Sequence, residues 1–394
     1  MEKLKYDVVA AGHICLDMSP KFGAGGAKKI DDIFIPGRLI NMNGVAFGPG
    51  GPVANTGFAI GRLGLKVLPM AGIGKDELGD ILSAIIKREI DVDITRKDSV
   101  ATSYSLILSP PGIDRIILHD PASNNDFGAD DVDYEMLKNA KLMHFGYPPL
   151  VRQMYIDNGK QLVDLYKRAK ETGITTSLDM SLPDTETESG QVDWKSIITS
   201  TLPYVDIFLP SIEEALFMLD KDEFDRVKAI SKGDDFTKHL DMAKVCELGE
   251  TIINMGSAMV LIKCGANGIY FKSAGKERLK KIGRAKPDDI ESWSNRELFR
   301  ETYVVESFKS ALAGGDTTIA GFLSAMLEGY DVYDALKIAC KTGALCCTTY
   351  DSISGLLPLN DVYEKTINEP ARNIYKIDLN KFTFDERKLV WIAE

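Results

Sequence analysis

Four adjacent residues, Ala313, Gly314, Gly315 and Asp316, combine an acid with a backbone that small side chains leave uncovered. They lie within Val304–Leu327, where a β-like run precedes them and an apolar helix follows. Small residues let a chain turn sharply and approach a ligand closely, and the first turn of a helix offers unpaired N–H groups and the positive end of its dipole. The stretch therefore predicts an anion-binding turn that contains one carboxylate.

Asp316 has a second interpretation, because a carboxylate at the start of a helix is also a common cap. Its side chain would then accept hydrogen bonds from the backbone N–H groups of Thr318 or Ile319. The stretch by itself leaves the cap and the catalytic group equally open.

A second glycine-rich stretch, Gly48–Leu65, places Gly50 and Gly51 before an amphipathic helix that carries Asn55 and ends near Gly64. The glycine spacing does not match a dinucleotide-binding fingerprint. A P-loop is also excluded, because no Gly-Lys-Ser/Thr follows. The stretch predicts a tight turn that exposes backbone beside the start of a helix.

Two further acids follow strand-like runs. Asp17 comes just after Tyr6–Ile14, and Asp179 ends Ile174–Leu178. The carboxyl ends of parallel strands are where α/β sheets bind ligands. A turn-forming Asp at the first position and a solvated strand end at the second are the alternatives.

Two turns in the second half of the chain carry further candidate residues. Ser211 can cap a helix, and Glu214 then occupies the capping-box position. Met259–Phe271 is typical of a strand, a turn and a strand, with Gly265 and Gly268 in the turn. Local structure alone explains both features equally well.

The elements that must position these residues follow a regular order. From Lys141 onward, short apolar runs alternate with helix-like stretches, which predicts a parallel sheet covered by helices. Thr102–His119 contains two β-rich runs around Pro110–Asp114, which predicts a hairpin. Asn124, Asn125 and Asp126 follow it as a turn or as contacts to a ligand.

Composition restricts the class of protein. With 394 residues the chain has room for one large domain or two smaller ones. A net charge of −11 and a pI near 5.1 oppose general affinity for nucleic acid or anionic membrane. No leader is visible and no apolar run approaches the roughly 18 residues of a membrane span. We therefore expect a cytoplasmic protein without nucleic-acid or membrane partners.

The cysteines, a charged segment and the C-terminal segment give three further expectations. The six cysteines show no Cys-x-x-Cys pair and no spacing suited to zinc, so we expect buried reduced thiols. Residues 272–302 are rich in charge, which predicts a solvated charged insertion. Residues 366–394 form a C-terminal extension whose Phe382 and Trp391 indicate that it packs against the rest.

Both glycine-rich stretches resemble the signatures of the PfkB-type, ribokinase-like carbohydrate kinases, in the family's order. The N-terminal signature corresponds to Gly50, Gly51 and Asn55. A Gly-x-Asp-x-x-Gly pattern follows at Gly74–Gly79. The C-terminal signature usually reads Asp-Thr-x-Gly-Ala-Gly-Asp, and here Ser310, Leu312 and Ala313 depart from it.

The resemblance implies a single ribokinase-like domain over residues 1–394, with a three-layer α/β/α fold. A small β-sheet lid would be formed from about 13–48 and 102–120. It also implies an ATP-dependent kinase in which Asp316 is the catalytic base. The N–H groups of Ala313, Gly314, Gly315 and Asp316 would hold the γ-phosphate.

The resemblance assigns the remaining ligands as well. Sugar would contact Asp17, Gly50, Gly51 and Asn55, and Glu214 would organise water around Mg²⁺. ATP would lie beside the positions that match the nucleotide-binding side of the family, namely Lys263, Gly265, Gly268 and Ser211. Some relatives bind a monovalent cation through an acid where this chain has Ser310, so we expect such a site to be weak. We also consider a homodimer formed through the lid.

Two alternatives remain open at this stage. A nucleoside kinase of the same fold would need an aromatic clamp over a base, for which the lid offers Phe34, Phe47 and Tyr104. A non-catalytic protein that senses sugar or nucleotide is the other, and the departures at Ser310, Ala313 and Ser211 favour it. ATP consumption distinguishes the second alternative from an enzyme.

Overall fold

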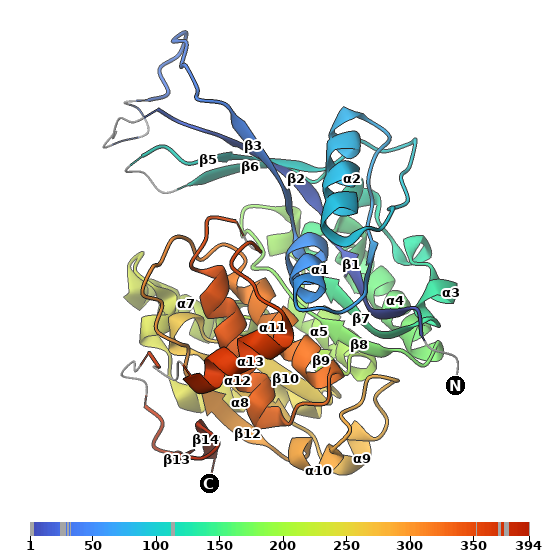
Figure 1. Cartoon of the computed structure of the whole chain (residues 1–394), viewed down its shortest axis with the longest axis vertical. Coiled ribbons are helices and arrows are strands. Elements are labelled where there is room, and N and C mark those ends of the chain that lie inside the picture. The colour runs from blue at the N-terminus through green and yellow to red at the C-terminus, as the bar shows by residue number, and fades with distance from the viewer. Residues whose placement is uncertain are drawn as a thin grey trace.

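The computed structural model describes residues 4–23, 29, 31, 33–111, 115–351, 353–368, 372–373 and 378–393. These residues form a large body built on a ten-stranded sheet and a separate four-stranded sheet that projects from one end of the body (Figure 1). The first described strand, Tyr6–Gly12, and the last, Val390–Ala393, both belong to the body (Figure 1).

The central sheet is parallel over most of its width. Its parallel strands, in spatial order, are β4 (Val67–Met70), β1 (Tyr6–Gly12), β7 (Ala140–Gly146), β8 (Thr175–Leu178), β9 (Ile207–Phe208) and β10 (Met259–Lys263). Antiparallel strands continue it as β11 (Ile269–Ser273), β12 (Glu297–Arg300), β14 (Val390–Ala393) and β13 (Phe382–Asp385). The strand, turn and strand predicted over 259–271 are confirmed as β10 and β11.

Successive residues of the strands face opposite sides, which divides the core into two apolar clusters. Val8 and Ala10 of β1 belong to one cluster, and Val9 and Ala11 belong to the other. The first cluster includes side chains of α1 (Pro52–Arg62), α2 (Glu77–Ile90), α9 (Lys276–Leu279), α10 (Ile290–Trp293), α11 (Gly314–Leu327), α12 (Val332–Cys346) and α13 (Leu359–Asn368). The second includes side chains of α3 (Tyr134–Leu137), α4 (Lys160–Glu171), α5 (Trp194–Thr201), α6 (Ile212–Leu219), α7 (Lys221–Ser231) and α8 (Met242–Asn254). The predicted three-layer α/β/α architecture is confirmed.

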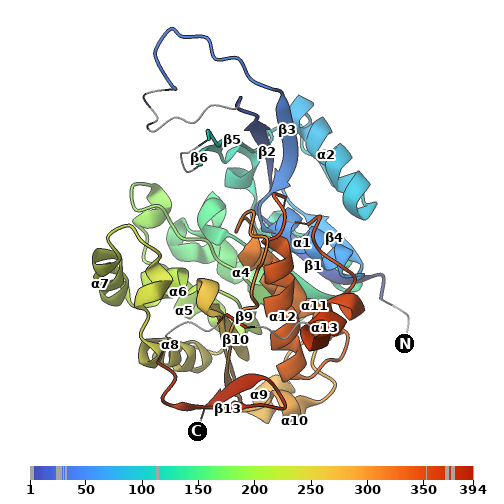
Figure 2. The ribbon, with the colours of Figure 1, turned by 60° about the vertical axis from the view of Figure 1, so that its left-hand side comes forward.

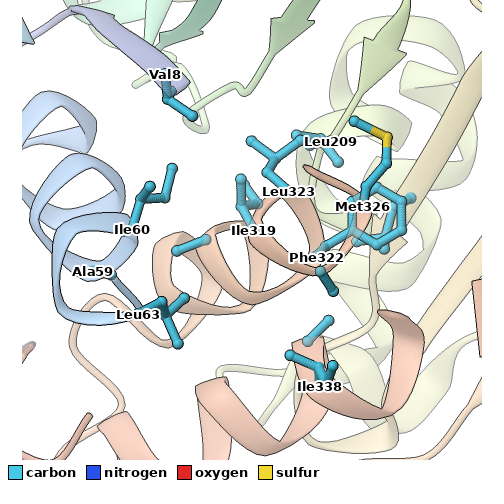
Figure 3. Close-up of a cluster of buried hydrophobic side chains, with 14 of the residues drawn as sticks. Val8, Ala59, Ile60, Leu63, Leu209, Ile319, Phe322, Leu323, Met326 and Ile338 are labelled. Carbon is cyan, nitrogen blue, oxygen red and sulfur yellow. The ribbon is translucent and has the colours of Figure 1, made fainter. Parts of the chain in front are cut away.

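Helix α11 is apolar on nearly every side and is embedded in the first cluster. Ile319 faces Ile60 of α1, Leu323 lies beside Leu209, and Ile338 of α12 lies on the opposite side of the helix (Figure 3). A helix that is buried all round cannot shift without opening the core. The residues at its N-terminus are therefore fixed relative to the sheet.

The four-stranded sheet, called the small sheet below, consists of β3 (Val45–Gly50), β2 (Cys15–Pro20), β5 (Tyr104–Leu108) and β6 (Ile116–Asp120) in that order. Strands β5 and β6 pair in antiparallel fashion, which confirms the hairpin, although residues 112–114 of its turn lie outside the described residues. The sheet stands beyond α1 at one end of the body in both orientations (Figures 1 and 2).

Residues 272–302 differ from the solvated insertion expected from their charge. They contain α9, α10 and β12, and β12 lies between β11 and β14 in the central sheet. Leu279, Trp293 and Leu298 are fully or almost fully buried. The high charge conceals an amphipathic pattern, because apolar residues between the charged ones enter the core, and even Arg300 and Glu301 are buried.

The C-terminal extension packs as expected. Strand β14 pairs with β12, and Phe382 and Val390 are buried. The indole Nε1 of Trp391 donates a hydrogen bond to Glu301 at 2.8 Å. Over the part of the chain that the structure describes, no helix has the length and apolarity required to cross a membrane.

Candidate active site

Asp316 lies in the first turn of α11 and is only 3% exposed. Its carboxylate accepts hydrogen bonds from Asn55 Nδ2 at 3.0 Å and Thr56 Oγ1 at 3.4 Å, both on α1. The hydroxyl of Tyr147 lies 3.0 Å from each carboxylate oxygen. The cap interpretation is wrong, because the residue at the N-cap is Ala313 and Asp316 bonds to other elements instead of to its own helix.

Tyr147 was not found from the sequence. It follows β7 and has left-handed backbone angles, φ 61° and ψ 51°, directly before Pro148. Such a conformation is costly for a bulky residue, and more so before proline, and strained residues of this kind concentrate at functional sites. A hydroxyl-bearing residue at the carboxyl end of a buried strand is the sequence signal that could have identified it.

The turn before α11 has the backbone geometry of an anion site. Ala313 adopts a left-handed conformation with φ 56°, which turns the chain into the helix. The N–H of Gly314 already donates to Ala311 O at 3.2 Å, in contrast to the expectation that it would be available to a ligand. Within the described chain, the N–H groups of Ala313, Gly315 and Asp316 have no acceptor. Three donors therefore remain at this helix end, beside a positive dipole.

Lys263, at the end of β10, lies in front of this turn. Its Nζ is 2.6 Å from Asp179 Oδ1 and 2.7 Å from the carbonyl oxygen of Leu209. A cavity of about 290 Å³ opens here, lined by Lys263 and by four acids, Asp179, Glu213, Glu214 and Asp316. Asp179 is thus a buried partner of a lysine, not the solvated strand end that we considered.

The electrostatics of this cavity are unbalanced, with four acids and one lysine in its lining. Burial raises the pKa of Asp179 to about 8, and it also raises the pKa values of Glu214 and Asp316, although the charge of Lys263 opposes each rise. Burial by itself would lower the pKa of Lys263, but its acidic neighbours raise that pKa overall. A further cation in this cavity would, like Lys263, lower the pKa values of these acids and favour their ionised form.

Ser211 and Glu214 form the capping box at the start of α6. Ser211 N donates to Glu214 Oε2 at 2.6 Å, and Glu214 N donates to Ser211 Oγ at 3.2 Å. Both residues nevertheless line the 290 Å³ cavity. The capping box engages Glu214 through its Oε2, and the residue still belongs to the cavity lining.

A larger cavity of about 480 Å³ adjoins the first. Most of its lining is apolar or backbone, and it includes Gly268, Tyr303 and Ala344. Lys263, Gly265, Ala311, Gly314 and Gly315 line both cavities. A side chain at Gly268 would strike Arg300 O at 2.1 Å, and φ there is 132°, so glycine is required by the turn as well as by the cavity.

Asp17 lies on the small sheet, not in a turn. It pairs with Gly48 of β3 on one side and Ser105 of β5 on the other, and Ser105 in turn pairs with His119 of β6. Residues directly opposite in neighbouring strands share a face, so these four form one row across the sheet. Burial raises the pKa of Asp17, although hydrogen bonds from Cys15 and Ser105 oppose the rise.

The glycines at the start of α1 allow this row to approach the body. A Cβ at Gly50 would lie 2.6 Å from the carboxylate of Asp17. A Cβ at Gly51, where φ is 87°, would lie 2.5 Å from His13 Nδ1. Asn55 lies one turn further along α1 and reaches Asp316. Asp17 is bonded instead to its own sheet, so the structure does not join it directly to Asp316.

Of the two interpretations of residues 124–126 the structure favours the turn, a 3₁₀ helix over Ala122–Asp126, and it does not support an aromatic clamp by Phe47 and Tyr104. Asn124 is fully buried and clamps Ile14, accepting from its N–H at 3.2 Å and donating to its carbonyl at 2.9 Å, so it is structural. Phe47 pairs with Met18, and Tyr104 pairs with Leu16. The alternation of β2 puts both aromatic rings on the face opposite Asp17, which does not suit a clamp over a ligand beside Asp17.

Comparison with known proteins defines the family. Residues 26–359 match the sequence model of the pfkB family of carbohydrate kinases. The chain belongs to this family. The resemblance to this family is thus confirmed, despite the departures at Ser310, Leu312 and Ala313.

Individual relatives of this carbohydrate kinase are distant. It is 23% identical over 355 residues to a 5-dehydro-2-deoxygluconokinase of Clostridium perfringens, with 89% of each chain covered. It is 24% identical over 298 residues to an uncharacterized sugar kinase of Archaeoglobus fulgidus, covering 75% of this chain and 97% of that one.

Solved structures share its fold. A putative ribokinase II of E. coli in complex with ATP and Mg²⁺ has a TM-score of 0.66 at 20% identity, covering 92% of this chain and 99% of that one. A fructokinase of Xylella fastidiosa with bound ATP has a TM-score of 0.66 at 16% identity, covering 93% and 100%.

Proposed function

We propose that this carbohydrate kinase transfers the γ-phosphoryl group of ATP to a hydroxyl of a small sugar or sugar derivative, with Asp316 as the general base. The observation that carries the proposal is the position of Asp316. It is buried, held by Asn55 and Tyr147, and lies in the smaller cavity where that cavity meets the larger one.

The proposed reaction needs little covalent chemistry from the protein. Asp316 takes the proton of the sugar hydroxyl, the oxygen bonds to the γ-phosphorus, and the bond to the β–γ bridging oxygen breaks to release ADP. The N–H groups of Ala313, Gly315 and Asp316 hold charge on the transferring group. Lys263 lies beside this path and can exchange its contact with Asp179 for a phosphate oxygen.

The two cavities suit the two parts of ATP. The larger one accepts adenosine on apolar and backbone groups, and the glycines that both cavities share let phosphates approach the backbone closely. Lys263, Gly265 and Gly268 are the residues that we assign to this side. Ser211 contributes by holding Glu214 in place.

Mg²⁺ fits the donor set of the smaller cavity. Oxygen ligands from one or two carboxylates, together with phosphates and water, are what this ion prefers, and Glu214 and Asp179 supply such carboxylates. The excess of acid over lysine favours a divalent cation there. When bound with ATP, Mg²⁺ would neutralise charge that develops on the phosphates.

Sugar recognition is assigned to the junction of the small sheet with α1. Asp17, the backbone of Gly50 and Gly51, and Asn55 would bind and orient hydroxyl groups. The small sheet would act as a lid over about 13–48 and 102–120, with the rest of residues 1–394 as one kinase domain.

The test is a phosphorylation screen over hexoses, pentoses, keto-deoxy acids and nucleosides, with ADP release and phosphorylated product both measured. We expect one sugar class to give saturable turnover that Asp316→Asn abolishes. Turnover only with nucleosides would replace the proposal by the nucleoside kinase. Binding without turnover of any member would replace it by a sensing protein.

We propose a homodimer through the small sheet as the assembly. Phe47, Met18, Leu106 and Leu118 form an apolar row on the face opposite Asp17, and Phe47 and Leu118 are 44% and 52% exposed. Contiguous exposed apolar side chains favour association. Light scattering after size exclusion should give a dimer that Phe47→Ser with Leu118→Ser converts to a monomer, whereas Tyr350→Ser should not. A monomeric wild type contradicts the proposal.

A cytoplasmic location and the absence of nucleic-acid or membrane partners are proposed as well. All six cysteines are free thiols, which suits a reducing compartment. The net charge of −11 opposes binding to polyanions. Cell fractionation, and gel-shift and vesicle-flotation assays with the purified protein, test these points.

A further inference from the structure

Three potential metal ligands meet where the small sheet joins the body. His13 directly follows β1, Cys15 begins β2, and His119 belongs to β6. One ligand atom from each of the three side chains lies within 4.8 Å of the other two. Nothing in the sequence spacing indicates the cluster, because His119 is more than 100 residues from the other two.

The hydrogen bonding of this cluster is incomplete. His13 Nε2 and His119 Nε2 face each other at 3.4 Å, and His119 Nδ1 is 3.1 Å from Ser105 Oγ. His13 is 3% exposed, yet its Nδ1 has no hydrogen-bond partner. In either tautomer His13 Nδ1 is left without a partner, which is costly for a buried imidazole, while its Nε2 meets only the Nε2 of His119.

The spacing matches a tetrahedral metal site. Two nitrogen atoms bound to zinc at about 2.0–2.1 Å lie roughly 3.4 Å apart, which is the separation of the two Nε2 atoms. A thiolate ligand is held slightly further away than an imidazole nitrogen, and Cys15 Sγ comes within 4.8 Å of the ligand nitrogen of each histidine. Imidazole and thiolate together select soft or borderline cations over Mg²⁺.

We propose that His13, Cys15 and His119 form a binding site for a zinc-like divalent cation, with the fourth coordination position open. Burial of the three ligands is uneven, since His13 and Cys15 are buried and His119 is exposed, so the cation would enter from the side of His119. On binding, the Cys15 thiol releases one proton to solvent and the two imidazoles bind through unprotonated nitrogens.

The charges that surround the site suit a cation. Cys15 Sγ lies 3.3 Å from Asp17 Oδ1 and 3.4 Å from Ser105 Oγ. Asp17 therefore adds a negative charge beside the thiolate. Ser105 Oγ fixes the ring of His119 by contacting its Nδ1, which leaves Nε2 for the cation. A ligand histidine with its second nitrogen engaged in this way is typical of protein metal sites.

The position of the site gives the cation a consequence for the kinase. The site joins His13 of the body to the small sheet and lies beside Gly51 and Asp17, which we assign to sugar binding. A bound cation would occupy part of that space and fix the small sheet against the body. We infer inhibition that is competitive with sugar, and this second step rests on the proposed function while cation binding does not.

Titration calorimetry with Zn²⁺, on the full chain without nucleotide, tests binding. We expect one site, and affinity at least about tenfold lower for His119→Ala and Cys15→Ser. His239→Ala and Cys246→Ser are the matched controls and should keep the wild-type affinity. His119 is exposed, so its substitution should leave the fold intact, as far-ultraviolet circular dichroism would verify.

Cobalt provides an independent readout. Co²⁺ added to the wild type should give a thiolate charge-transfer band that Cys15→Ser abolishes and Cys246→Ser keeps. Zinc affinity that is the same in all four variants, or a cobalt band that survives Cys15→Ser, overturns the proposal. Loss of sugar affinity in the variants without any zinc binding by the wild type also overturns it, and assigns the cluster to sugar instead.

Kinetics test the consequence separately. With an excess of Mg²⁺ over ATP and with free Zn²⁺ buffered, Zn²⁺ should raise the apparent KM for sugar and leave kcat unchanged, and His119→Ala should weaken that effect. Inhibition competitive with ATP contradicts the inferred inhibition. If the screen finds no turnover, calorimetry and cobalt spectra still decide whether the cation binds.

Discussion

The end of the site around Asp316 and the end around Asp17 are built differently. Asp316 is bonded to α1 and to the residue after β7, all within the body, and it lies in the first turn of the embedded helix α11. Asp17 is bonded within a projecting sheet whose outer residues are partly exposed and apolar. The difference indicates that the chemical groups are preorganised, whereas sugar recognition depends on where the small sheet lies.

The consequence is a separation of effects between kcat and KM. Changes at the Asp316 end should act on the chemical step with little effect on binding, and changes at the Asp17 end should act mainly on sugar affinity. Four experiments test this contrast.

Asp316→Asn should have the largest effect, a fall in kcat of about 10²–10⁴-fold with ATP and sugar affinity nearly intact, because the amide keeps the shape but cannot accept the proton. Steady-state kinetics and calorimetry measure the two quantities. Asp331→Asn, at the N-cap of α12, is the matched control and should behave as wild type, since Asn also caps well. Near-normal kcat in Asp316→Asn would remove Asp316 from the role of base.

Asp17→Ala should raise the KM for sugar by roughly 10–100-fold and leave the KM for ATP unchanged, because a charged hydrogen-bonding group is lost on one side only. Asn55→Ala should weaken sugar binding more than ATP binding as well. It should also lower kcat, since Asn55 Nδ2 bonds to Asp316. Calorimetry in which either variant loses ATP affinity more than sugar affinity would contradict this layout.

Tyr147→Phe should lower kcat by about tenfold and shift its pH dependence. The Tyr147 hydroxyl lowers the pKa of Asp316 against the effect of burial, so its removal should raise that pKa. A base must be deprotonated to act, and therefore the acid limb of the pH profile of kcat should move to higher pH. Tyr134→Phe, whose hydroxyl bonds to Ala129 O, is the control. An unchanged acid limb would show that Asp316 does not govern the profile.

The smallest expected effect is that of potassium, with a change in rate of less than about twofold relative to a bulky organic cation at equal ionic strength. Ser310 offers no charge to offset dehydration of the ion, and its Oγ already accepts the N–H of Leu312 at 3.0 Å. A large saturable activation by potassium would mean that other oxygen atoms build the site.

Sequence patterns predicted the body well because they record local requirements. Alternating apolar runs and helix-like stretches predicted the layered sheet, and the capping residues of α6 were identified from their spacing. The pattern failed at 272–302, where charge concealed a strand of the central sheet. An average over a segment cannot show which of its residues face inward.

The sequence alone determined the family, the three-layer fold and the two glycine-rich turns, since each depends on residues close together in the chain. Only the tertiary structure decided that Asp316 bonds to Asn55 and Tyr147 instead of capping its helix, and that Asp179 pairs with Lys263. It alone brought His13 to His119 and put Phe47 on the face opposite Asp17. These contacts join residues from different strands and helices, and their geometry follows from how the sheets and helices pack, which no local spacing records.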